Sequence, residues 1–284
     1  MSQTHISNLK GKPSAVCTMA TSHALKDLKI FIYSLRLFEE TIPIYILCDT
    51  ETQQGLERFK NDDNIFIYPN LDKYSNKNRQ QMEKMGIWTE FMLRKCDVID
   101  IALDNRPDVL FADADVCFLN NLPTIYIERF DIGGSPHYIR KGDTDKYGYY
   151  NGGMLWVRNS NVTTKWKEYS KNSRFFEQSA IEDLMKEFKS FEFSIQNNFG
   201  WWRLFQCDEP RERMKKFTIC SVSGNIYYDD KPLRSIHTHL TEKTDRNMPM
   251  FNNIIKQLLD GGKSKNKAYS KLMIFLNLVK NALI

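Results

Sequence analysis

The sequence contains no apolar run of the roughly 18 residues that a membrane-spanning helix needs. Its first residues, MSQTHISNLKGKPSAV, are polar and lack the apolar core of a signal peptide. The 6 cysteines form no C-x-x-C pair, so the usual spacings of zinc and redox sites are absent. These absences predict a cytoplasmic protein whose cysteines are small, buried hydrophobic residues in a reducing compartment.

The chain also lacks an excess of basic residues outside its last segment. It has 40 Lys and Arg and 35 Asp and Glu residues, for a net charge of +5. Residues 263–284, KSKNKAYSKLMIFLNLVKNALI, hold five of the lysines and no acid, so residues 1–262 carry 35 basic and 35 acidic residues. A balanced body argues against nucleic acid as a partner.

The tail of residues 263–284 combines these lysines with apolar residues from Ala268 onward. One interpretation is a basic, apolar helix that docks on an anionic membrane surface, which would make the protein peripheral at the membrane, or on another subunit. The other is a C-terminal helix that packs on the body of the molecule.

The remaining chain is long enough, and with 42% hydrophobic residues apolar enough, for one sizeable domain over residues 1–262. In its first half, apolar strand-like runs alternate with segments of helical spacing. The predicted strands are 13–20, 42–49, 64–69 and 108–119, and the predicted helical regions are 22–39 and 79–104. This alternation predicts an α/β fold with a mostly parallel sheet between helices.

The second half is less regular and predicts a smaller mixed sheet. Its predicted strands are 130–138, 151–157, 217–223 and 233–240, and its predicted helix is 179–191. No Pro- or Gly-rich linker separates the two halves, so we expect one domain rather than two.

Two aspartates interrupt the apolar run VLFADADVCFL, residues 109–119. Burying a carboxylate is costly unless it is paired or binds a metal. Residues two apart on a strand face the same way, and Asp113 and Asp115 lie where a strand of a parallel sheet ends and ligands bind. If the strand instead breaks into a turn at Asp113, the two can still converge on one ion. Two carboxylates suit Mg²⁺ or Mn²⁺, and the alternative is that they cap nearby backbone.

Two further stretches add candidate site residues. SIHTHLTEK places His237 and His239 on one face of a strand, with Lys243 shortly after, and imidazole suits Mn²⁺ better than Mg²⁺. In YYNGGMLWV, Asn151 offers an amide to sugar hydroxyls, and Gly152 lets backbone approach a ligand. The alternative for the glycines is a turn that opens a strand.

The stretches FADADVCFL, YYNGGMLWV, FFEQSAI and IHTHLTEK occur in this order. Together they resemble the nucleotide-sugar glycosyltransferases of the GT-A fold, and in particular glycosyltransferase family 8, the group of glycogenin and bacterial galactosyltransferases. The resemblance covers residues 14–245. It implies a GT-A fold with a nucleotide-binding half at about 14–120 and an acceptor-side half at 121–262.

The resemblance also implies roles for individual residues. Asp113, Asp115 and His237 would bind Mn²⁺ or Mg²⁺, with His239 as the competing ligand. Gln178, after Glu177, would lie below the anomeric carbon, and Lys243 would bind the diphosphate. The donor-binding positions implied are Thr18, Ala20, Thr21, Asp49, Arg94, Lys95, Ala112, Asp113, Asn151, Gly152 and Lys243.

The sequence departs from the family at three places. Glu177 stands where the family has aspartate, and Lys243–Asp245 reads KTD where the family has K-P-W. No aromatic residue follows the first strand to stack on the base, since the residues there are His23, Ala24 and Leu25.

The resemblance implies a metal-dependent transfer of sugar from a UDP-sugar to a hydroxyl of a glycan, lipid-linked or protein acceptor, with retention of configuration. In an inverting variant, Glu177 would be the base. Rival functions are a nucleotidyltransferase that makes nucleotide-sugars and a non-catalytic sugar-binding protein. A nucleotidyltransferase usually has a glycine-rich basic loop, which the stretch TMATSHALKD lacks. A sugar-binding protein would not need the full set of metal-binding residues.

Overall fold

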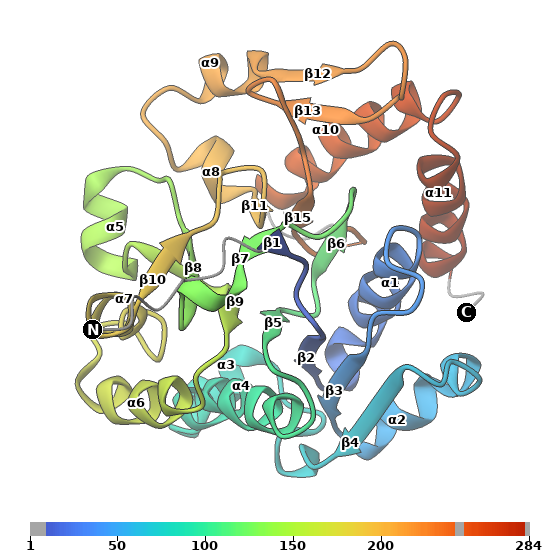
Figure 1. The fold of residues 1–284 in the computed structure, drawn as a ribbon. Helices are drawn as coiled ribbons and strands as arrows, with labels where there is room; N and C mark the ends of the chain where they lie inside the picture. The colour runs from blue at the N-terminus through green and yellow to red at the C-terminus, as the bar shows by residue number, and fades with distance from the viewer. Residues whose placement is uncertain (1–9, 242–246, 282–284) are drawn as a thin grey trace, which may run out of the picture.

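The structure, a computed structural model, describes residues 10–241 and 247–281 (Figure 1). Within these residues the main sheet has strand order β10-β8-β9-β5-β2-β3-β4. In chain order its strands are Val16–Ala20 (β2), Ile44–Cys48 (β3), Ile65–Pro69 (β4), Val109–Ala112 (β5), Ile132–Pro136 (β8), Tyr150–Val157 (β9) and Ser190–Glu192 (β10).

The nucleotide-binding half expected at residues 14–120 contains the parallel part of this sheet. Strands β5, β2, β3 and β4 pair in parallel, whereas β9 is antiparallel to both of its neighbours and β10 is parallel to β8. The predicted mostly parallel sheet is therefore confirmed, with one reversed strand contributed by the second half of the chain.

Helices cover both faces of the main sheet, because neighbouring strand residues point to opposite sides and nearly all are apolar. One face packs against Trp88–Leu103 (α4), Arg79–Lys84 (α3), Asn161–Tyr169 (α6) and Ile181–Glu187 (α7). The other face packs against Leu25–Arg36 (α1) and the region of Thr50–Gly55 (α2). The predicted helical region 79–104 thus forms two helices, α3 and α4.

The predicted strand 108–119 is wrong as a single element. Strand β5 ends at Ala112, Asp113 to Asp115 form a turn closed by a hydrogen bond from the Val116 N–H to the Asp113 carbonyl, and Val116–Phe118 (β6) continues in a different sheet. There β6 pairs with Ser235–His237 (β15), which also pairs with Phe199–Gly200 (β11). The chain leaves the main sheet at this turn because the two parts of the run pair with different partners.

The remaining elements surround this core. Phe217–Ile219 (β12), Ile226–Tyr228 (β13) and Lys231–Pro232 (β14) form a small antiparallel sheet beside Asn247–Gly262 (α10) (Figure 1). Lys10–Gly11 (β1) pairs with Ile125–Tyr126 (β7). The short helices are Lys141–Tyr147 (α5), Trp202–Phe205 (α8) and Pro210–Lys215 (α9).

The C-terminal segment forms the helix Lys267–Lys280 (α11), which lies against α10 and α1 (Figure 1). Its apolar face, including Tyr269, Leu272 and Phe275, is buried with β15 and α10 in one hydrophobic cluster. The Phe275 ring stacks on Tyr33 of α1 at a centroid distance of 3.9 Å. The structure thus favours the interpretation of the tail as a helix packed on the body.

Five of the cysteines are buried and Cys220 is half-buried, and all are free thiols, in line with their interpretation as small hydrophobic residues. No helix in residues 10–241 or 247–281 has the length and apolar character to cross a bilayer.

Candidate active site

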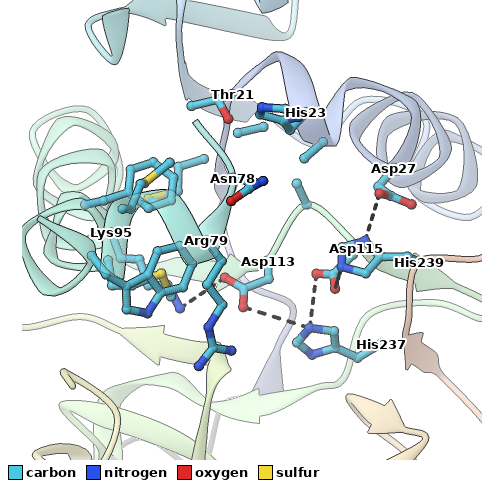
Figure 2. Close-up of a pocket in the computed structure, with 18 of the residues that line it drawn as sticks. Thr21, His23, Asp27, Asn78, Arg79, Lys95, Asp113, Asp115, His237 and His239 are labelled. Atoms are coloured by element: carbon cyan, nitrogen blue, oxygen red, sulfur yellow. Dashed lines mark hydrogen bonds and ion pairs between the residues drawn. The ribbon is translucent and has the colours of Figure 1, made fainter. Parts of the chain in front are cut away.

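A cavity of about 770 Å³ opens where the carboxyl ends of β2 and β5 meet the start of α1. Figure 2 shows Thr21 and His23 along one edge of it and the aspartates of the β5–β6 turn opposite. His237 reaches it from the end of β15. The cavity therefore brings together segments from both halves of the chain.

Asp113, Asp115 and His237 point toward one another in this cavity (Figure 2). The His237 Nε2 atom lies 3.0 Å from Asp115 Oδ1 and 3.9 Å from Asp113 Oδ2. One donor atom from each of the three residues lies within 4.8 Å of the others, so they can hold one ion. Two carboxylate oxygens and one imidazole nitrogen form a donor set that fits Mn²⁺, or Mg²⁺ less closely.

The two histidines also stabilise the charge of Asp115. Burial alone would raise the pKa of this carboxyl group, but the neighbouring His237 and His239 rings hold the pKa well below its usual range. An ionised carboxylate at this position is the form that a cation requires.

His239, the competing ligand, lies at the edge of the group. Its Nδ1 atom is 2.9 Å from Asp27 of α1, and its Nε2 atom is 3.6 Å from Asp115 Oδ2. The side chain is 45% exposed, compared with 9% for His237. Of the two histidines, His237 therefore lies in the three-residue donor group, and His239 bridges that group to α1.

Lys95 is a buried cation beside this group. Its ammonium lies 3.2 Å from Asp113 and 3.4 Å from Glu177, and donates a hydrogen bond to the Gly152 carbonyl at 3.0 Å. Burial would lower the pKa of Lys95, yet the two carboxylates raise it. Burial likewise raises the pKa of Glu177, against the opposing effect of Lys95. The buried ammonium is therefore shared between two carboxylates, and Glu177 is buried together with it.

Gln178 lines the same cavity, and backbone groups fix its amide. Its Oε1 atom accepts a hydrogen bond from the Gly152 N–H at 3.1 Å, and its Nε2 atom donates one to the Tyr147 carbonyl at 2.9 Å. Asn151 lines the cavity beside it and donates to the same Oε1 atom at 3.4 Å. The residues predicted from YYNGGMLWV and FFEQSAI are therefore neighbours.

Of the donor-binding positions predicted at the end of the first strand, Ala20 and Thr21 line the cavity. Thr18 and Ala112 are fully buried within the sheet and do not line it. Lys243 lies outside the described residues, so its predicted role remains a prediction.

Asp49 and Arg94 are not brought into the cavity. Asp49 is fully buried and caps α2, where it accepts hydrogen bonds from the backbone N–H groups of Thr52 and Ser22. Arg94 forms an ion pair with Asp97 at 2.6 Å one helical turn away. Each was predicted from its position near a strand end or in the helix before the aspartates, but its hydrogen-bond and ion-pair partners do not line the cavity.

The structure also adds to the cavity Arg79 and Phe176, which the sequence analysis did not single out. The Arg79 guanidinium lies over the rings of Trp88 and Phe176 at 5.3 and 5.7 Å, in a wall of the cavity. Trp202 forms part of the wall near His237, with ring centroids 4.9 Å apart. Phe176 directly precedes Glu177 in FFEQSAI, which was a usable signal, whereas nothing in the sequence around Arg79 indicates its place.

A family model for nucleotide-diphospho-sugar transferases matches residues 43–198 of this chain. The chain belongs to that family. The match includes the β5–β6 turn, Asn151 and the Glu177–Gln178 pair, and it bears out the predicted enzyme class, a glycosyltransferase. No curated protein sequence matches the transferase.

Solved structures of glycosyltransferases share the fold of this transferase. GlyE of Streptococcus pneumoniae TIGR4 is 12% identical with a TM-score of 0.55, over 96% of this chain and 64% of GlyE. The galactosyltransferase LgtC, solved with donor and acceptor sugar analogs, is 13% identical with a TM-score of 0.54, over 88% of this chain and 96% of LgtC. The bifunctional WbbM is 9% identical with a TM-score of 0.53, over 93% of this chain and 52% of WbbM.

The transferase thus spans about two thirds of the length of GlyE and half that of WbbM. At such low identities the likeness shows the fold alone, and it confirms the predicted GT-A architecture. Membership of glycosyltransferase family 8 stays a prediction.

Proposed function

We propose that this chain is a metal-dependent glycosyltransferase that moves a sugar from a UDP-sugar to an acceptor hydroxyl with retention of configuration. The observation that carries the proposal is the convergence of Asp113, Asp115 and His237 at the carboxyl end of β5. These three residues would hold a divalent cation. Mn²⁺ is favoured because one of the three donors is an imidazole nitrogen. When bound, such a cation stabilises the negative charge that develops on a departing diphosphate.

The cavity has the shape and charge to hold the rest of the donor. Its volume of about 770 Å³ is in the range of sites for drug-sized ligands and exceeds what a single sugar needs. Ala20 and Thr21 would contact the nucleoside, while Lys26, Lys77 and Arg79 at the same cavity provide positive charge for a diphosphate.

Lys95 and Gln178 would position the sugar beside the cation. Lys95 is fixed by Asp113, Glu177 and the Gly152 carbonyl, so it would act on the donor through its positive charge, from a rigid place. We assign Glu177 to holding Lys95 rather than to deprotonating an acceptor, because its carboxylate is buried against that ammonium. Gln178, with its amide oxygen already bonded to the Gly152 N–H, would steady positive charge on the sugar without acting as a strong nucleophile. This division of roles favours retention.

The acceptor and the cellular location are proposed at a coarser level. The indole of Trp202 beside His237 offers an aromatic face for a sugar ring, which supports a glycan or glycolipid acceptor. Cytoplasmic location follows only from the sequence analysis and stays a prediction.

The test is transfer from a panel of UDP-sugars, with wild type, Asp115→Ala and, as a control, Asp260→Ala on the exposed surface of α10. Wild type and the control should turn over only with Mn²⁺ or Mg²⁺. Asp115→Ala should lose at least about a hundredfold in kcat/KM, because a catalytic metal contributes several kcal/mol. The anomeric configuration of the product, determined by proton NMR, tests retention.

Other outcomes would favour the rival functions. Turnover that is unchanged by EDTA and by Asp115→Ala would contradict the metal site. Sugar binding without transfer would indicate a sugar-binding protein, and formation of a UDP-sugar from UTP and a sugar phosphate would indicate a nucleotidyltransferase.

A further inference from the structure

A chain of buried hydrogen bonds leads from the ring of His237 into the second half of the molecule. The His237 Nδ1 atom lies 2.7 Å from Asn198 Oδ1, and Asn198 Nδ2 donates to Asn151 Oδ1 at 2.9 Å. Asn151 Nδ2 in turn lies 3.2 Å from His137 Nε2. All four side chains belong to residues that are at most 9% exposed, so water does not compete for these bonds.

The backbone N–H of Gly153 determines which atoms in this series of hydrogen bonds are donors. The Gly153 N–H, which can only donate, points at Asn151 Oδ1 at 2.9 Å. The Asn198 atom that faces the same oxygen must therefore be its NH₂ group, and the Asn198 atom facing His237 must be its carbonyl oxygen. A carbonyl oxygen only accepts, so the proton of that bond belongs to Nδ1 of His237.

A second anchor holds Asn198 in this orientation. Its Nδ2 atom also donates to Ser135 Oγ at 3.1 Å, and the same Oγ accepts from the Arg203 guanidinium at 2.9 Å. The Asn198 backbone N–H donates to Ser235 Oγ at 2.9 Å, and its φ of 55° lies in the left-handed region, which asparagine tolerates better than most residues. The residue is therefore fixed at both its backbone and its side chain.

We infer that Asn198 is a positioning residue that keeps a proton on Nδ1 of His237 and thereby directs Nε2 to a cation held by Asp113 and Asp115. With the proton on Nδ1, Nε2 is the nitrogen left to bind a cation, and it is the nitrogen 3.0 Å from Asp115. The inference rests on the proposed function, because it assumes a cation at this site.

The same series of hydrogen bonds extends to the proposed sugar site. Asn151 Nδ2 also donates to Gln178 Oε1 at 3.4 Å, so Asn151 is hydrogen-bonded to both Asn198 and Gln178. Loss of Asn198 should therefore disturb the cation site first and the orientation of Gln178 second.

The experiment compares Mn²⁺ binding, measured by electron paramagnetic resonance, in wild type and Asn198→Gly. Glycine accepts the left-handed backbone but removes the hydrogen bond to the His237 ring. Outer partners of this kind contribute about 10–100-fold to metal affinity, so Asn198→Gly should bind Mn²⁺ more weakly by that factor. Asn76→Gly, an exposed asparagine with φ of 57°, is the matched control and should bind like wild type.

A second readout uses the metal-free wild type. Nitrogen-proton correlation spectra of its histidine rings should show a slowly exchanging proton on Nδ1 of His237, and the chain has only 5 histidines to assign. An unprotonated Nδ1 there, or wild-type Mn²⁺ affinity in Asn198→Gly, would overturn the inference. Wild type that binds no Mn²⁺ would instead contradict the proposed function, and the inference with it.

Discussion

At the scale of single residues, Asp113 connects the two charged parts of the site. One oxygen lies 3.2 Å from Lys95 and the other 3.9 Å from His237. It therefore belongs both to the proposed cation site and to the buried pair of Lys95 and Glu177. This arrangement couples the position of the sugar-side lysine to that of the proposed metal.

His137 provides a residue-scale test of the buried polar chain. Burial lowers the pKa of His137 from 6.5 to about 4, against the opposing effect of the hydrogen bond that its Nδ1–H donates to the Gly148 carbonyl. The folded protein therefore binds this proton less readily than the unfolded chain. The contribution of the neutral His137 ring to the free energy of unfolding is complete above pH 6.5 and is lost as the pH falls toward 4.

The expected loss is roughly 3 kcal/mol in total, of which about 2 kcal/mol is lost by pH 5. Urea unfolding of wild type and His137→Gln from pH 8 to pH 5 measures it. The difference in unfolding free energy between the two proteins should fall by that amount at the acid end. A difference that stays constant with pH would show that His137 is not a buried neutral ring.

At the scale of elements, the turn between β5 and β6 decides the site. The Asp113 N–H donates to the Gly153 carbonyl at the last rung beside β9, and the Thr238 N–H, just after β15, donates to the Asp115 carbonyl. The two aspartates are thus held from two different sheets. In a continuous strand both aspartates would lie in one sheet, and their side chains would be neighbours only because residues two apart point to the same face.

Helix α11 is the second element whose role the structure decides. Leu272 is fully buried in the hydrophobic cluster with α10, whereas Ile274, two residues later, is 62% exposed. Leu272→Ala should lower the free energy of unfolding by about 2–5 kcal/mol, because it leaves a cavity in this cluster. Ile274→Ala should change it by no more than about 0.5 kcal/mol.

Urea unfolding of the two variants measures this difference. If Leu272→Ala were as stable as Ile274→Ala, α11 would not be part of the core. The helix would then be available for the membrane or subunit docking that the sequence analysis considered.

At the scale of the whole molecule, the two halves of the chain meet at Gly153 of β9. A Cβ atom built there would lie 2.3 Å from His237 Cε1 and 2.8 Å from Asp113 Oδ2, and also 2.8 Å from Asn151 Oδ1. These groups come from β15, the β5–β6 turn and β9. Only a residue without a side chain leaves room for all of them.

Gly153→Ala should therefore separate the donor atoms and weaken Mn²⁺ binding at least about tenfold, with a parallel loss of transfer. Gly142→Ala in α5, where a Cβ meets no atom within 4 Å, is the control and should bind like wild type. Titration followed by electron paramagnetic resonance, with circular dichroism to check the fold, measures the effect. Wild-type affinity in Gly153→Ala would show that the halves do not close on the cation in this way.

How much of this was predictable depends on how far apart the partners are in sequence. The parallel strands β2, β3 and β4, helix α4 and the place of Asp113 and Asp115 at a strand end were predicted well, since side-chain periodicity is a local property. Asp49 does not line the cavity, because Thr52, Ser22 and Ser75 donate hydrogen bonds to its oxygens, and the last two lie too far along the chain for a local pattern to reveal them. The break after Ala112 was considered only as an alternative to one continuous strand, because β5 and β6 have different strand partners, which lie more than 30 residues away along the chain.

By itself, the sequence determined the α/β class, the acidic pair at a strand end and the order of motifs that resembles the nucleotide-sugar glycosyltransferases. Local spacing and residue chemistry are sufficient for these. Only the tertiary structure decided that His237 rather than His239 joins Asp113 and Asp115, that Lys95 is shared between two carboxylates, and that Asn198 stands behind the His237 ring. Each of these depends on contact between side chains that are remote in the chain, and such contacts arise from packing rather than from any local pattern.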